Sequence, residues 1–98
     1  MDRNTAIARL KAHEAELRAM GVSGLSLFGS VARGEARPDS DVDVAVRLDA
    51  ARRVTLFGLA EVNHRLEAML GTRVDLVSEG GLKPRFKARI AADRVHVF

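Results

Sequence analysis

The spacing of apolar residues divides the chain into stretches of helical and of strand character. Apolar side chains recur at intervals of three and four within residues 4–20 and again within 55–70, and a glycine follows each stretch. Short apolar or alternating runs typical of strands form three further stretches: residues 22–28, 42–46 and 72–77. The pattern therefore predicts helices that alternate with strands.

The connections and the C-terminal part complete this pattern. Residues 29–34 are predicted to open a brief helical turn, and the polar residues 35–40 then lead to the second strand. A turn at 80–81 precedes a short helix over 83–92, and 95–98 is expected to add a strand. These elements predict an α/β or α+β fold: a single small mixed sheet flanked by helices on at least one face.

Length and composition limit the kind of protein to consider. The 98 residues suit one small domain spanning 1–98, and the absence of cysteine excludes disulfides and thiolate metal sites. No stretch is long and apolar enough for a bilayer, and the N-terminus lacks the pattern of a secretory signal, so we expect a soluble cytoplasmic protein without a membrane partner. A net charge of +3 with 4% aromatic residues is too weak a bias to predict nucleic-acid binding.

Two aspartates occur in the otherwise apolar second strand. Because successive side chains of a strand point to opposite faces, Val42, Val44 and Val46 share one face. Asp41 and Asp43 share the other face, roughly 6.6 Å apart along the strand, which allows both to reach common metal ions. Neighbouring carboxylates repel each other, and a bound cation offsets that repulsion. We therefore expect a cation site on the open face of the sheet.

A third aspartate has matching parity in the third strand. Asp75 is expected to face away from Val74 and Leu76. If the second and third strands are neighbours, three carboxylates share one sheet face, and that donor set suits magnesium. The alternative is a surface carboxylate paired with an arginine such as Arg73.

The first strand ends in Gly29-Ser30. A strand that enters a helical turn at this dipeptide exposes backbone amides and one hydroxyl, and both attract phosphate. Glycine also permits a close approach of the backbone. The alternative for Ser30 is an ordinary N-cap without a ligand.

Other chemistries find less support in the sequence. Residues 29–34 have the outer glycine spacing of a P-loop, but Glu35-Ala36 follows where Lys and Ser or Thr are required. The three histidines have no metal-ligand spacing. Four basic residues near the C-terminus either contact a nucleotide or a partner or form a solvated helix face, and the solvated face is favoured for each: Lys83, Arg85, Lys87 and Arg89.

The segment GSVARGEARPDSDVDV, followed later by RVDLV, resembles the polymerase-beta-type nucleotidyltransferase superfamily. The resemblance is specifically to its minimal, MntA-like bacterial members. It covers essentially the whole chain, in the order of the elements and in the three aspartates. It implies a nucleotidyltransferase-like fold.

The resemblance also implies roles for the aspartates. Asp41 and Asp43 would bind two magnesium ions that hold the triphosphate of ATP. Asp75 would bind one of these ions and help to activate the attacking hydroxyl. A two-metal site of this kind stabilises the attacking and the departing oxygen of an in-line displacement.

The remaining candidate residues surround the triphosphate in the same comparison. By the resemblance, Gly29 and Ser30 would contact the triphosphate. Arg33 either helps to hold it or braces the loop. Catalytic and metal roles are thus expected for the three aspartates, and nucleotide binding for the glycine, the serine and the arginine.

The acceptor is expected to be a separate molecule. Larger relatives carry an extra domain that recognises the acceptor, and this chain has no residues left for one. Minimal members are typically encoded beside an all-helical HEPN ribonuclease toxin and transfer AMP from ATP to a tyrosine of that toxin. Such an antitoxin, able to form a hetero-oligomer with its toxin, is the leading hypothesis. The alternatives are a non-catalytic antitoxin that acts by complex formation, or an aminoglycoside-type nucleotidyltransferase subunit.

Overall fold

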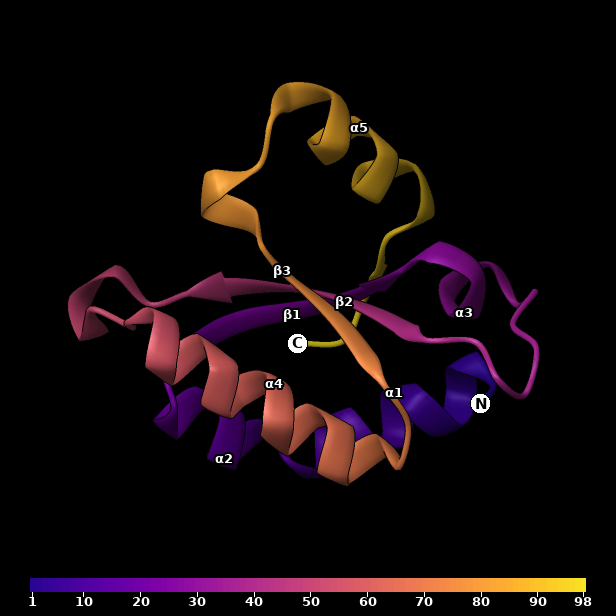
Figure 1. Cartoon of the computed structure of the whole chain (residues 1–98), viewed down its shortest axis with the longest axis horizontal. Coiled ribbons are helices and arrows are strands. Elements are labelled where there is room, and N and C mark those ends of the chain that lie inside the picture. The colour runs from indigo at the N-terminus through magenta and orange to yellow at the C-terminus, as the bar shows by residue number, and fades with distance from the viewer.

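The computed structural model describes residues 1–98 and contains one four-stranded mixed sheet (Figure 1). Its strands are β1 (Val22–Phe28), β2 (Val42–Leu48), β3 (Val74–Ser78) and β4 (Val95–His96), and they lie side by side in the order β3-β2-β1-β4. β1 is antiparallel to both β2 and β4, whereas β2 and β3 are parallel. The predicted fold class is confirmed.

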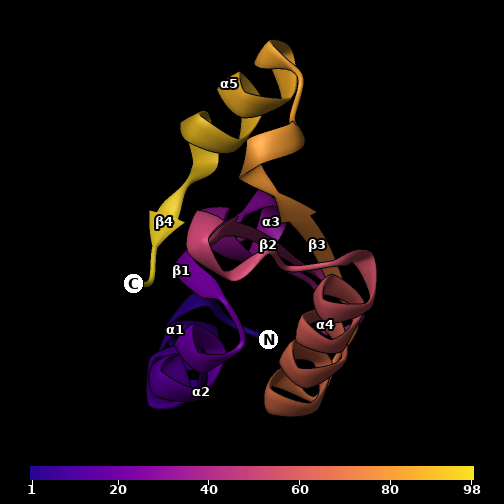
Figure 2. The same ribbon diagram turned by 90° about the vertical axis from the view of Figure 1, so that its left-hand side faces the viewer.

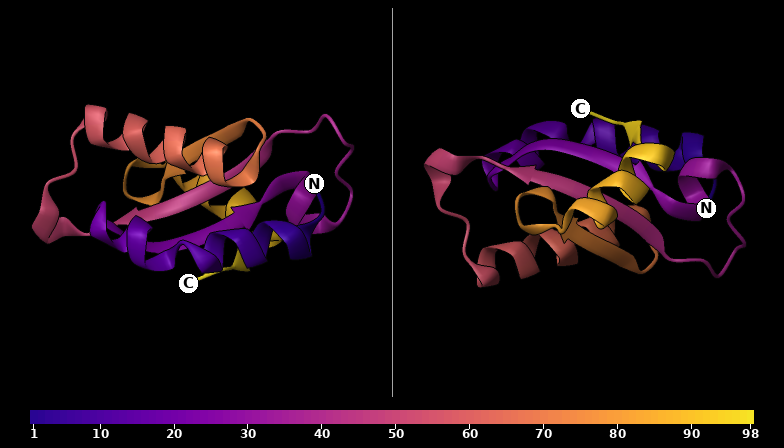
Figure 3. Two further views of the ribbon diagram at one scale, coloured as in Figure 1. Left: turned by 90° about the horizontal axis from the view of Figure 1, so that it is seen from below. Right: turned by 90° about the horizontal axis from the view of Figure 1, so that it is seen from above.

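The helices cover the two faces of the sheet unequally. One face carries α1 (Arg3–Ala12), α2 (Glu14–Ala19) and α4 (Leu56–Leu70), and the opposite face carries α5 (Pro84–Asp93) (Figure 2). Seen from below, α4 lies beside the pair formed by α1 and α2 (Figure 3). The short helix α3 (Gly29–Arg33) follows β1 directly, and two 3-10 turns complete the chain: η1 (Ala50–Arg52) and η2 (Glu79–Gly81). None of these helices combines the length and the apolar character needed to cross a membrane.

The core lies between the sheet and the three-helix layer. The side chains of Val42, Val44 and Val46 are completely buried, together with Leu10 and Leu66 from the helices. The strand parity expected for β2 is therefore confirmed. Burial of a whole apolar strand face against helices is the main stabilising contribution in a domain of this size.

The N-terminal helix differs from the prediction of a single helix over residues 4–20. It is interrupted at His13, whose φ of −110° and ψ of 17° leave the helical region, and α2 begins at the next residue. The ring Nδ1 of His13 lies 2.8 Å from the carbonyl oxygen of Arg9. Leu10 and Leu17 remain fully buried on either side of the break, so both short helices keep their apolar side on the core.

The second face of the sheet was expected to be open, but α5 covers part of it (Figure 2). Ala45, which shares the parity of Asp43, is completely buried, and Ile90 of α5 is 1% exposed. α5 thus covers part of the face and leaves a pocket at the end of β2 rather than a flat surface. The last two strands are also displaced or shorter than expected, at 74–78 against 72–77 and at 95–96 against 95–98.

Candidate active site

The parallel pairing of β2 and β3 brings two of the predicted aspartates together. In the register of the two strands, Asp43 lies directly opposite Asp75. Residues opposite each other in neighbouring strands point to the same face, so both carboxylates stand on the side of α5. Asp41 lies two residues earlier, just before β2 begins.

Asp43 is half-buried and surrounded by negative charge. Burial raises the pKa of its carboxyl above the ordinary value. The charges of Asp75 and Asp41 raise it further, as does a hydrogen bond with Asp75, whereas the positive charge of Arg33 lowers it. The protein therefore holds this carboxylate where an ionised form is disfavoured unless a cation is close.

Gly29 lies against Asp43 and has no room for a side chain. Its φ is +73°, a conformation that L-residues with a side chain rarely adopt. A Cβ atom added there would lie 2.9 Å from Cγ of Asp43 and closer still to its Oδ2. The sequence therefore needs glycine at this position for two reasons, the backbone turn and the adjoining carboxylate.

These residues line a pocket of about 360 Å³. The end of β1 and helix α3 contribute Phe28, Gly29, Ser30 and Arg33, and the sheet contributes Asp43 and Asp75. The other side of the pocket is formed by one face of α5: Phe86, Arg89, Ile90 and Asp93. Five of the six predicted site residues line this pocket, and the sixth, Asp41, lies outside its lining.

Arg33 is already engaged by two carboxylates. Its Nε donates to Glu35 at 3.0 Å, and its Nη1 donates to Asp93 of α5 at 2.7 Å. These hydrogen bonds raise the pKa of the guanidinium above its ordinary value. Of the two roles that the sequence leaves open for Arg33, these contacts favour bracing: Arg33 joins α3 to α5.

The contribution of α5 is the part of the site that sequence reasoning missed. Phe86, Arg89, Ile90 and Asp93 follow one another at helical spacing, which places them on one face. The sequence pattern predicts for Arg89 only that it is one of four basic residues, with a solvated helix face as the favoured interpretation. The available signal was this spacing around a buried isoleucine, together with Pro84 in the first turn of the helix.

The carboxylates form a partial donor set for a metal ion. Asp43 and Asp75 supply facing oxygen donors, the kind that magnesium prefers. The side chains are not gathered into a group of three or more acidic or histidine residues that could enclose an ion. The oxygen donors of the facing pair and the mutual repulsion at Asp43 fit the binding of divalent cations at this place.

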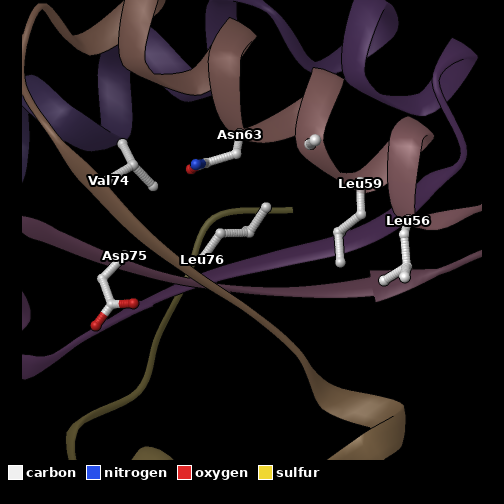
Figure 4. Close-up of a pocket in the computed structure, with 7 residues that line it drawn as sticks. Leu56, Leu59, Asn63, Val74, Asp75 and Leu76 are labelled. Carbon is white, nitrogen blue, oxygen red and sulfur yellow. The ribbon is translucent and has the colours of Figure 1, made fainter.

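A second hollow adjoins the other side of β3. It has a volume of about 360 Å³ and lies between β3 and the first half of α4. Leu56, Leu59 and Asn63 point from α4 toward the strand (Figure 4). The carboxylate of Asp75 points away from Leu76 (Figure 4), and Asp75 lines both this hollow and the pocket beside α5. Five of the seven residues that line this hollow are apolar, and Asp75 is its one charged residue.

A family comparison matches nearly the whole chain. Residues 10–97 match the model of the nucleotidyltransferase domain. The chain belongs to the nucleotidyltransferase domain family. It is a nucleotidyltransferase, and the relatives described next place it among the minimal, MntA-like members.

Curated relatives are similar over most of their length. The protein adenylyltransferase MntA of Thermococcus cleftensis is 43% identical over 89 residues, which cover 90% of this chain and 88% of the relative. MJ0435 of Methanocaldococcus jannaschii is 35% identical over 79% of this chain and 81% of its own. The similarity to the family therefore extends well beyond the aspartate motif.

Solved structures show the same arrangement of elements. A structure described as a minimal nucleotidyltransferase is 42% identical and superposes with a TM-score of 0.81, covering 97% of this chain and 95% of its own. A toxin–antitoxin complex crystallised with AMP-PNP contains a chain that is 22% identical with a TM-score of 0.73; all of this chain and 73% of that one are covered. The second match supports the fold alone.

Proposed function

We propose that this nucleotidyltransferase transfers AMP from ATP to a tyrosine hydroxyl of a partner HEPN-type toxin, with magnesium, and so neutralises the toxin. The observation that carries the proposal is the pair Asp43 and Asp75, which face each other in a pocket bordered by Gly29 and Ser30. This arrangement places acidic donors beside a backbone segment that a phosphate chain can approach closely.

The residues have separate roles in the proposed site. Asp41, Asp43 and Asp75 would hold two magnesium ions, and Gly29 and Ser30 would contact the triphosphate. Magnesium, when bound, would neutralise phosphate charge and stabilise the attacking and the departing oxygen. Asp75 would receive the proton of the acceptor hydroxyl, because it lines the pocket from β3, the edge strand of the sheet.

The proposed reaction is one in-line displacement. The acceptor oxygen forms a bond to the α-phosphorus of ATP, and the bond from that phosphorus to the bridging oxygen of the β-phosphate breaks. The electron pair of the broken bond stays with pyrophosphate, and the hydroxyl proton passes to Asp75 and then to water. The products are the adenylylated acceptor and pyrophosphate.

Relatives support the choice of acceptor. The relative at 43% identity is a protein adenylyltransferase, and several structural neighbours are MntA antitoxins crystallised with their toxins. One neighbouring structure contains a HEPN toxin that carries three AMP groups. Adenylylation of a HEPN partner is therefore the acceptor chemistry with most support.

A transfer assay with two matched variants tests the proposal. The chain, magnesium and α-labelled ATP are incubated with a candidate HEPN toxin, and label on toxin tyrosine is measured. Asp43→Asn is expected to lower transfer by about 10²-fold or more, because it removes a carboxylate that would hold the magnesium ions. Asp39→Asn, which removes an exposed acidic group of the preceding loop, serves as the control and is expected to retain transfer.

The assay also separates catalysis from simple binding. Ionised Asp43 is disfavoured in the folded chain, so the asparagine variant is expected to fold at least as well as the wild type. If Asp43→Asn still neutralises the toxin without labelling it, the antitoxin acts by complex formation. No label on the toxin with the wild-type chain would refute the proposed transfer.

A further inference from the structure

One face of α5 closes the pocket opposite the aspartates. Phe86, Arg89, Ile90 and Asp93 lie at positions i, i+3, i+4 and i+7 of the helix, and all four line the pocket. Ile90 is 1% exposed and anchors the helix, whereas Phe86 and Arg89 are exposed to solvent. Arg89 is therefore able to contact a ligand that binds between α5 and the sheet.

Arg89 is the pocket cation without a carboxylate partner. Asp93 lies one turn further along α5 and would be its natural partner at i+4. Asp93, however, binds Arg33 at 2.7 Å, and Arg33 also binds Glu35. Arg89 forms no ion pair, so its charge is available to a ligand while the charge of Arg33 is compensated.

The guanidinium of Arg89 lies over the ring of Phe86. The ring of Phe86 is one turn earlier on the helix, and the centre of the Arg89 guanidinium lies 5.9 Å from the ring centroid. Phe86 is 46% exposed, so its ring is open to the solvent on the side of the pocket that it lines. A cation over an aromatic face is attracted to it and loses less freedom when it binds an anion.

We infer that Arg89 binds the β- and γ-phosphates of the nucleotide and neutralises the pyrophosphate as it leaves, with Phe86 as its positioning residue. The inference rests on the proposed function for the choice of ligand. Gly29 and the aspartates border one side of the pocket, and Arg89 approaches from the other. When the bond to the α-phosphorus breaks, the added negative charge on pyrophosphate meets the N–H donors of the Arg89 guanidinium.

Three ligands locate the contact on the phosphate chain. Calorimetry with magnesium compares the binding of AMP-PNP, inorganic pyrophosphate and AMP to the wild type and to Arg89→Ala. Because Arg89→Ala removes a charged hydrogen-bonding partner, it is expected to lower the affinity for AMP-PNP and for pyrophosphate about 10- to 100-fold. AMP lacks the β- and γ-phosphates, so its affinity is expected to stay within about twofold.

Arg85→Ala is the matched control. Arg85 is exposed on the same helix but does not line the pocket, and its replacement changes the net charge by the same amount. A general electrostatic effect would lower the affinity for pyrophosphate equally in Arg89→Ala and Arg85→Ala, and that result would overturn the inference. Equal weakening of AMP and AMP-PNP in Arg89→Ala would overturn it as well, as would failure of the wild type to bind pyrophosphate.

The role of Phe86 is tested by a double-mutant cycle. Phe86→Leu is expected to lower the affinity for pyrophosphate in the wild-type background and to have little further effect in Arg89→Ala. The reason is that Phe86 contributes to binding through the guanidinium of Arg89. Additive losses would show that Phe86 acts independently and would remove it from the inference. If the binding pattern holds while the wild-type chain leaves the toxin unlabelled, the phosphate contact stands and the proposed acceptor fails.

Discussion

At the scale of single residues, Gly29 at the start of α3 packs directly against the carboxylate of Asp43. Gly29→Ala is expected to destabilise the fold by more than the roughly 1 kcal/mol that a left-handed backbone costs an L-residue, because its Cβ also meets Asp43. Gly34 has a similar φ of +75° but no atom within 4 Å of an added Cβ, so Gly34→Ala isolates the backbone cost. Chemical denaturation of both variants measures the difference. Equal losses would mean that Asp43 moves aside without cost.

The residues that sequence reasoning placed well are those governed by local periodicity. Period-two alternation predicts that Asp43 faces away from Val42 and Val44, and that Asp75 faces away from Val74 and Leu76. That the two carboxylates share one face depends on the pairing of β2 with β3, which the sequence pattern leaves as a condition and the fold supplies. The partners of Arg33 were not predictable in the same way, since Asp93 is 60 positions distant and meets it only after α5 folds over the sheet. Ion pairs between distant elements leave no pattern in the sequence around them.

At the scale of elements, α4 and β3 border the second hollow, and one buried polar atom of its lining has no hydrogen-bond partner. Oδ1 of Asn63 is buried and accepts no hydrogen bond. Asn63→Leu replaces the amide by an apolar group of similar shape, and we expect it to raise the free energy of unfolding by about 1 kcal/mol. Thermal unfolding checks this, with His64→Leu at an exposed position of the same helix as the control. A lower stability of Asn63→Leu would contradict the expectation.

The predicted elements were also right where local signals mark their ends. Thr55 accepts a hydrogen bond from the backbone of Gly58, and Gly71 ends α4 with a φ of 69°, so both limits of this helix are encoded next to it. The break at His13 has no glycine or proline to announce it. It follows from how two short helices pack on the sheet, which a local pattern does not contain.

At the scale of the whole molecule, the position of α5 depends on a few contacts that cross the pocket. The Arg33–Asp93 pair joins α3 to the C-terminal end of α5, and Ile90 anchors the same helix in the interior. Because the pair is partly exposed, it contributes little to the free energy of global unfolding. Its main effect is on the free energy of the local opening of α5. The pocket is therefore expected to lose its α5 side before the sheet unfolds.

Arg33→Ala tests whether this bridge sets the geometry of the pocket. Amide hydrogen exchange in α5 is expected to accelerate several-fold, while exchange in β2 stays unchanged, because only the local opening is affected. Affinity for AMP-PNP is expected to fall with it, since an opened α5 carries Arg89 away from the phosphates. Arg65→Ala removes a surface ion pair with Glu16 on the opposite side of the sheet and serves as the control. Unchanged exchange in α5 of Arg33→Ala, together with a loss of AMP-PNP affinity, would instead assign Arg33 a direct contact with the nucleotide.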